Sequence, residues 1–222
     1  MGSLKRFDLN RIIKDYNIAY LFETGTFLGD GVAYAQQSNF KKIFSVEIIP
    51  QIAADARKRF ANDTSVEIIT ADSISALQKT LPTLNENIIF WLDAHFPGAD
   101  AGLTHYDADN NEELRLPLTK ELATISKLRV NNNDVFILDD LRIYEDGPYE
   151  LGNVPTDALP KTNRNLNFVY EYFDKSHFII KSYLDEGYTI LFPKKRYKKV
   201  HFKWSNLFKK DVAVDDLYLA EK

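Results

Sequence analysis

The sequence contains no cysteine among its 222 residues. Disulfides, cysteine-ligated zinc and thiol nucleophiles are therefore excluded, and the composition fits a reducing compartment. The sequence also lacks a run of about 20 apolar residues, which a membrane helix requires. Residues 1–5 lack the apolar stretch of a signal peptide. We therefore expect a cytoplasmic protein with no membrane span.

An excess of positive charge is missing too. The formal net charge is -4 at pH 7, and the pI is about 5.6. No overall positive field attracts nucleic acid, so nucleic acid is not an expected partner. Only the C-terminal tail over 194–222 is locally basic, which suits either a solvated face or a surface for an anionic acceptor or partner.

Apolar residues, in contrast, are abundant. They make up 45% of the chain, and aromatic residues contribute 13%. This composition supports one sizeable hydrophobic core but not two comfortable domains. We expect a single domain over 1–222, with its core over about 15–193.

Short apolar runs alternate with amphipathic stretches along the chain. Strands are predicted over 19–22, 43–46, 66–69, 88–92 and 135–138. Helices are predicted over 9–16, 31–38, 50–60, 73–81 (with Ser73 as its cap) and 118–129. Strands that are apolar on both faces and separated by helices indicate a parallel sheet covered on both sides. The runs 178–183 and 188–192, joined by four residues, predict an antiparallel hairpin at its end.

Two long polar segments interrupt this pattern, over 96–117 and 143–165. Each follows the C-terminal end of a strand, where ligands bind in open α/β sheets. Loops of this length in a compact domain are often functional. We expect them to act as lids that carry acceptor contacts, with these candidates: His105, Tyr106, Asp107, Arg142, Tyr144 and Tyr149.

The strongest local signal is the turn Glu23-Thr24-Gly25-Thr26-Phe27-Leu28-Gly29 between a strand and a helix. Thr26 and Phe27 break the Gly-x-Gly-x-x-Gly pattern that seats a pyrophosphate. The spacing Gly25-x-x-x-Gly29 after an acid suits a methyl donor instead. The carboxylate of Glu23 can meet a cationic amino-acid group directly or through water.

Two further acids follow the next strands. Glu47 lies about 20 residues beyond the glycine turn, where an acid can accept two hydrogen bonds from a ribose diol. Asp72, with Ser73 beside it, can meet the exocyclic amine of adenine.

The order of these elements and acids resembles the class I S-adenosylmethionine-dependent methyltransferases. The resemblance covers about residues 15–193. It implies an α/β, Rossmann-like, doubly wound and mostly parallel seven-stranded sheet with an antiparallel C-terminal hairpin strand. The cofactor is then S-adenosylmethionine, and its expected binding residues are Glu23, Thr24, Gly25, Thr26, Gly29, Glu47, Ile48, Asp72, Ser73 and Asp93.

Three carboxylates are expected at the chemical end of the site. Asp93 follows the fourth strand, and Asp139 and Asp140 follow the fifth. Parallel strand ends are neighbours, and like charges packed together raise each other's pKa unless a cation intervenes. A hard divalent ion, Mg²⁺ first, fits such oxygen ligands. In the other interpretation, Asp139 or Asp140 caps a turn and Asp93 contacts the donor or acceptor.

The pattern is similar to metal-dependent small-molecule O-methyltransferases, including those that act on macrolide sugars. This similarity implies Asp93, Asp139 and Asp140 as metal ligands and a small-molecule or glycan acceptor. His95 departs from the pattern of those enzymes. Three roles are open for His95: a general base, a metal ligand or a structural residue. The expected catalytic group is Asp93, His95 and Asp139.

Other classes stay open at this point. A metal-independent O- or N-methyltransferase would use His95 as its base. A nicotinamide-dependent oxidoreductase is disfavoured by the missing third fingerprint glycine. A non-catalytic nucleotide-binding module would keep the fold alone. Homodimers are the usual state of such enzymes, although no interface signal stands out.

Overall fold

The computed structural model describes residues 2–99, 102–103, 105, 111–130, 133–161, 164–201 and 218–219. The expected contacts Tyr106 and Asp107 lie outside these residues, as does most of the basic tail. Among the helices of the described part, none has the length and apolar character that crossing a bilayer requires.

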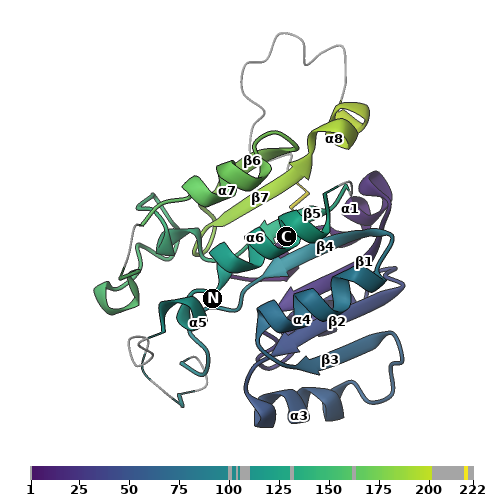
Figure 1. Ribbon diagram of the computed structural model, residues 1–222, viewed down its shortest axis with the longest axis horizontal. Helices are drawn as coiled ribbons and strands as arrows, with labels where there is room; N and C mark the ends of the chain where they lie inside the picture. Colours follow the sequence, from purple (N-terminus) through teal and green to yellow (C-terminus); the bar gives the residue numbers. More distant parts are fainter. Residues whose placement is uncertain are drawn as a thin grey trace.

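Seven strands form one sheet in the order β3-β2-β1-β4-β5-β7-β6 (Figure 1). Their bounds are β1 (Ile18–Thr24), β2 (Lys42–Glu47), β3 (Val66–Thr70), β4 (Asn87–Leu92), β5 (Val135–Leu138), β6 (His177–Ser182) and β7 (Tyr188–Pro193). The first five strands pair in parallel. β7 is antiparallel to both β5 and β6. The predicted α/β Rossmann-like sheet with its antiparallel hairpin is therefore confirmed.

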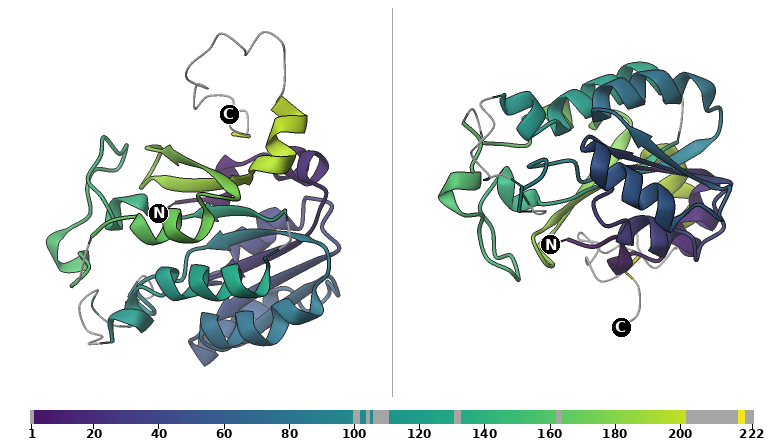
Figure 2. Two further views of the ribbon diagram at one scale, coloured as in Figure 1. Left: turned by 45° about the horizontal axis from the view of Figure 1, so that its top comes forward. Right: turned by 90° about the horizontal axis from the view of Figure 1, so that it is seen from below.

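Helices cover both faces of the sheet (Figure 2). Their bounds are α1 (Leu9–Tyr16), α2 (Asp30–Ala35), α3 (Pro50–Arg59), α4 (Ser73–Thr80), α5 (Glu112–Arg115), α6 (Leu118–Leu128), α7 (Asn167–Phe173) and α8 (Lys194–His201). One core lies between the sheet and α4, α6 and α7. The other lies between the sheet and α1, α2 and α3. This layering explains why the strands are apolar on both faces.

Alternate strand residues supply the two cores. Phe22, Phe90 and Phe136 point to one face, and the rings of the last two stack 5.0 Å apart. Their neighbours Leu21 and Ile89 point to the other face. All five side chains are at most 1% exposed, so the central strands are fixed by burial from both sides.

The structure differs from the sequence prediction at one helix cap. Asp72, not Ser73, is the N-cap of α4, and its Oδ1 accepts a hydrogen bond from the backbone N–H of Ser75 at 2.9 Å. An aspartate accepts this bond as readily as a serine does, so the two adjacent residues compete for the cap position.

The described parts of the two predicted lids contain helical turns and contact each other. The first contains the short helix α5. Arg115 in α5 is 1% exposed and donates hydrogen bonds to Glu112 and to the backbone oxygen of Leu159. Glu112 in turn accepts the backbone N–H of Lys161 at 2.8 Å. These contacts join the first segment to the second.

Candidate active site

A cavity of about 370 Å³ lies at the C-terminal ends of β1, β2 and β4. The strand order reverses between β1 and β4, which is where open α/β sheets bind their ligands. The volume falls in the range of small-molecule sites.

Most of the predicted site residues line this cavity. They are Glu23, Gly25, Thr26, Glu47, Ile48, Asp72, Ser73, Asp93, His95 and Asp139. Thr24, Gly29 and Asp140 are not among its lining residues. The ten residues therefore share one cavity, and the other three lie outside its lining.

The glycine turn brings the ends of three strands together. Gly25 has a φ of +87°, and a Cβ on it would lie 2.4 Å from the backbone oxygen of Asp93. Its N–H donates to the backbone oxygen of Val46 at 2.9 Å. Thr24 is fully buried, and its Oγ1 accepts the N–H of Asp93 at 3.3 Å. Gly29 has a φ of +80° and begins α2 as its N-cap.

Glu23 is 2% exposed at the floor of this turn. Burial, with a smaller contribution from the charge of Glu47, raises the pKa of Glu23 to about 8, although the hydrogen bond from the Ser45 hydroxyl opposes the shift. A carboxylate in such a place ionises readily only when a cation arrives. Glu23 is therefore suited to bind an ammonium group.

Glu47 is held by the backbone. Its two carboxylate oxygens accept the N–H groups of Phe27 at 3.0 Å and Ile49 at 2.9 Å. An ionised carboxylate has about four acceptor positions, so Glu47 keeps capacity for ribose hydroxyls. Asp72 uses Oδ1 for its helix cap and also lines the cavity.

Of the apolar residues that line the cavity, local sequence patterns predicted only Ile48. Ile52, Ala71 and Ile74 join the predicted Ile48 in its lining. Ile52 and Ile74 stand in the first turns of α3 and α4, which start at the same edge of the sheet. Both residues follow a predicted acid closely in the sequence, and this proximity could have indicated that they line the cavity.

The N-terminal segment was missed as well. Residues 2–5 line the cavity, and the backbone N–H groups of Gly2 and Ser3 donate to Glu186 at 2.8 Å and to the Tyr188 hydroxyl at 2.9 Å. These partners lie at the far end of the sequence, so no local pattern could reveal them.

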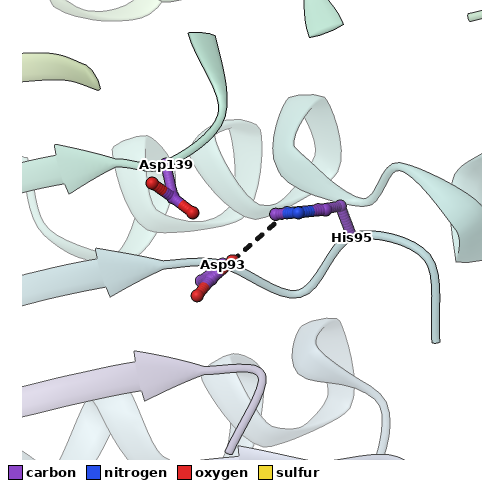
Figure 3. Close-up of side chains that lie close together, drawn as sticks. All are labelled: Asp93, His95 and Asp139. Carbon is purple, nitrogen blue, oxygen red and sulfur yellow. Dashed lines mark ion pairs between the residues drawn. The ribbon is translucent and has the colours of Figure 1, made fainter. Parts of the chain in front are cut away.

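Asp93, His95 and Asp139 lie close together (Figure 3), and all three line the cavity. Each can offer one ligand atom to a common space, and these atoms lie within 4.8 Å of one another. His95 Nδ1 is 3.3 Å from Asp93 Oδ1. The ends of β4 and β5 thus bring together Asp93 and Asp139, two of the three carboxylates that the sequence predicts here.

The two carboxylates of this group are poorly placed to be ionised together. Burial raises the pKa of Asp93 well above its ordinary value, and the charge of Asp139 adds to the shift. Burial and the charge of Asp140 raise the pKa of Asp139 in the same direction. Asp139 Oδ1 is buried and has no hydrogen-bond partner among the described residues. Such a donor set fits a divalent cation, which would favour both ionised forms.

Asp140 is turned toward different partners. Its carboxylate accepts a hydrogen bond from Arg142 Nε at 3.0 Å and lies 3.6 Å from His95 Nε2. Arg142 is also paired with Glu186. Asp140 has a φ of 53° and a ψ of 55°, a left-handed conformation that aspartate tolerates. The structure thus brings Asp93 and Asp139 together with His95 rather than with Asp140.

Among the described residues, those expected to contact the acceptor do not line the cavity together. Tyr144 and Tyr149 are buried in the core, and His105 is exposed away from the cavity lining. Tyr144 instead lines a second, small cavity of about 10 Å³, and His95 and Glu121 line it too. Burial raises the pKa of Glu121 to about 7. Glu121 is a single glutamate in an amphipathic helix, so the sequence did not indicate that it lines this cavity.

No family model matches the sequence, and no curated protein matches it either. Solved structures, in contrast, do match. They show a class of fold, that of the class I S-adenosylmethionine-dependent methyltransferases.

Three solved structures illustrate the similarity. An O-methyltransferase from Bacillus cereus, in complex with S-adenosylhomocysteine, has a TM-score of 0.54 and 13% identity, covering 84% of this chain and 79% of that one. TomG from Streptomyces achromogenes, an O-methyltransferase in complex with S-adenosylmethionine, has a TM-score of 0.50 and 12% identity, with coverages of 83% and 77%. The methyltransferase domain of bacterial CtHen1-C has a TM-score of 0.52 and 9% identity, with coverages of 83% and 94%.

Proposed function

We propose that this chain is an S-adenosylmethionine-dependent methyltransferase that methylates an oxygen of a small polar acceptor, such as a sugar of a glycan or secondary metabolite. One observation carries the proposal: Glu23 and Glu47, on the ends of adjacent strands, line the same cavity on either side of a glycine turn. The donor's α-ammonium group would meet Glu23, and its ribose hydroxyls would meet Glu47. Its adenine would lie among Ile48, Ala71 and Ile74.

The reaction places few covalent demands on the protein. The acceptor oxygen attacks the sulfonium methyl carbon, the carbon–sulfur bond breaks with its electrons going to sulfur, and the acceptor's proton is lost. The thioether product is neutral. Orientation of the two reactants alone supplies on the order of 7–11 kcal/mol. The walls formed by residues 2–5, Pro97 and Leu114 would exclude water.

Two routes remain for the acceptor proton. A divalent cation, Mg²⁺ or another, held by Asp93 and Asp139 would lower the pKa of the acceptor hydroxyl and fix its oxygen. The buried oxygen of Asp139, which has no partner among the described residues, supports this route. In a metal-independent enzyme, His95 would take the proton, and its place at the cavity between Asp93 and Asp140 supports that role. Activity that survives a chelator favours the second route.

Isothermal titration calorimetry with S-adenosylhomocysteine tests the donor assignment. We expect one site per chain, with NADH giving no heat at the same concentrations. Bound ligand stabilises the folded state according to its concentration over its Kd, so S-adenosylhomocysteine should also raise the Tm. Heat with NADH alone would indicate an oxidoreductase instead.

A further inference from the structure

We propose that the metal site of this chain consists of Asp93, His95 and Asp139, with Asp140 as a residue that positions His95, and that it selects a first-row transition ion such as Mn²⁺ over Mg²⁺. This inference rests on the proposed function. It departs from the ligand set of three aspartates that the sequence resemblance implies.

The spacing of the ligand atoms supports an imidazole ligand. Two neighbouring ligands on an octahedral ion with bonds near 2.1 Å lie about 3.0 Å apart. His95 Nδ1 and Asp93 Oδ1 are 3.3 Å apart, and Asp139 completes a set within 4.8 Å. The side chain of His95 is only 16% exposed, so its ring is held in this orientation by the surrounding chain.

Asp140 occupies the opposite edge of the imidazole ring. Its Oδ2 faces His95 Nε2 at 3.6 Å, while its Oδ1 accepts the hydrogen bond from Arg142. Arg142 is held in turn by Glu186 from the β6–β7 connection. Histidines that bind metals commonly direct their second ring nitrogen to a carboxylate, which fixes the tautomer and the ring orientation. Asp140 is placed for that role, and its own carboxylate is neutralised by Arg142.

The mixed ligand set determines the choice of ion. Mg²⁺ strongly prefers oxygen ligands, whereas imidazole suits transition ions. One imidazole and two carboxylates leave further coordination positions for acceptor oxygens.

The test is a metal titration of the full chain without donor, using Mn²⁺ alone and Mg²⁺ alone. We expect Mn²⁺ to bind about tenfold or more tightly than Mg²⁺. Pulsed electron paramagnetic resonance of the Mn²⁺-loaded protein should show coupling to an imidazole nitrogen. The variant His95→Gln should lose this coupling and most of the preference for Mn²⁺.

Two asparagine variants separate the roles of the neighbouring aspartates. Asp140→Asn keeps a residue that accepts the left-handed backbone, and we expect it to weaken Mn²⁺ binding by about 10–100-fold while keeping the nitrogen coupling. Asp139→Asn should abolish binding. Asp55→Asn, on the surface of α3, should leave it unchanged. Circular dichroism of each variant checks that it is folded.

Three results would overturn this inference: no Mn²⁺ binding, no nitrogen coupling in the wild type, or equal losses in Asp139→Asn and Asp140→Asn. The last result would make Asp140 a ligand. Calorimetry with S-adenosylhomocysteine on the same sample keeps the two proposals apart, because donor binding without metal binding contradicts only the metal site.

Discussion

At the scale of single residues, the site depends on carboxylates that the fold keeps away from water. Glu23 is the clearest case, since it is 2% exposed and its carboxylate is hydrogen-bonded by a neutral hydroxyl, that of Ser45. Burying a charge without a cationic partner is costly, so such a group stays protonated until a cation reaches it. The donor's ammonium group would be that cation.

Donor affinity should therefore increase with pH up to about 8. The pKa of Glu23 in the free protein is about 8, so below this pH the carboxylate must lose a proton before it can pair with the ammonium group. Affinity should fall by up to about tenfold per pH unit below that value, until the pKa of the bound state is reached. Calorimetry with S-adenosylhomocysteine between about pH 6 and pH 8, in buffers of different ionisation enthalpy, measures both the affinity and the released proton.

The matched control is Glu23→Gln. It keeps the shape of the side chain but cannot ionise, so its donor affinity should show little dependence on pH in this range. At pH 8 it should bind about 10–100-fold more weakly than the wild type, because a charge-assisted hydrogen bond contributes about 1.5–3 kcal/mol. Wild-type affinity that is flat or falls as pH rises would exclude Glu23 as the ammonium-binding group.

At the scale of elements, a buried ion pair supports the strands that carry the site. Arg129 follows α6 and pairs with Asp134, just before β5, at 2.8 Å, with side chains 3% and 2% exposed. Arg129 also donates to the backbone oxygens of Leu84 and Glu86, and Asp134 accepts the N–H of Ile88 in β4. The pair thus fixes where β4 and β5 begin, and hence where Asp93 and Asp139 emerge.

Arg129→Ala should lower the free energy of unfolding by about 3–5 kcal/mol, since it leaves the carboxylate of Asp134 buried without its cation. Urea denaturation followed by circular dichroism measures this loss. Lys41→Ala, which removes the exposed partner of Glu86, serves as the control and should leave stability almost unchanged. Equal effects of the two substitutions would contradict the role assigned to Arg129.

The elements themselves were readable from the sequence because their signals are local. Apolar runs gave all seven strands, and Pro50 marked the start of α3. The short helices α5, α7 and α8 were missed because they lie in or beside segments that are rich in polar or charged residues. The orientation of Asp140 was also beyond local patterns, because it depends on Arg142 and on Glu186, which lies 44 residues beyond Arg142.

At the scale of the whole molecule, the fold brings the four acidic residues of the candidate site to one edge of the sheet. Glu23, Glu47, Asp93 and Asp139 all line one cavity, although more than a hundred residues separate the first from the last. The parallel arrangement of β1, β2, β4 and β5 produces this convergence, because the strands end on the same side. A net charge of -4 then favours cationic ligands over polyanions.

The most direct measurement of donor binding in this cavity is a crystal structure of the chain with S-adenosylhomocysteine bound. We predict its ammonium group on Glu23, its ribose hydroxyls on Glu47 and its sulfur facing the group of Asp93, His95 and Asp139. A ligand bound elsewhere, or one whose amino-acid end points away from Glu23, would contradict the proposed function.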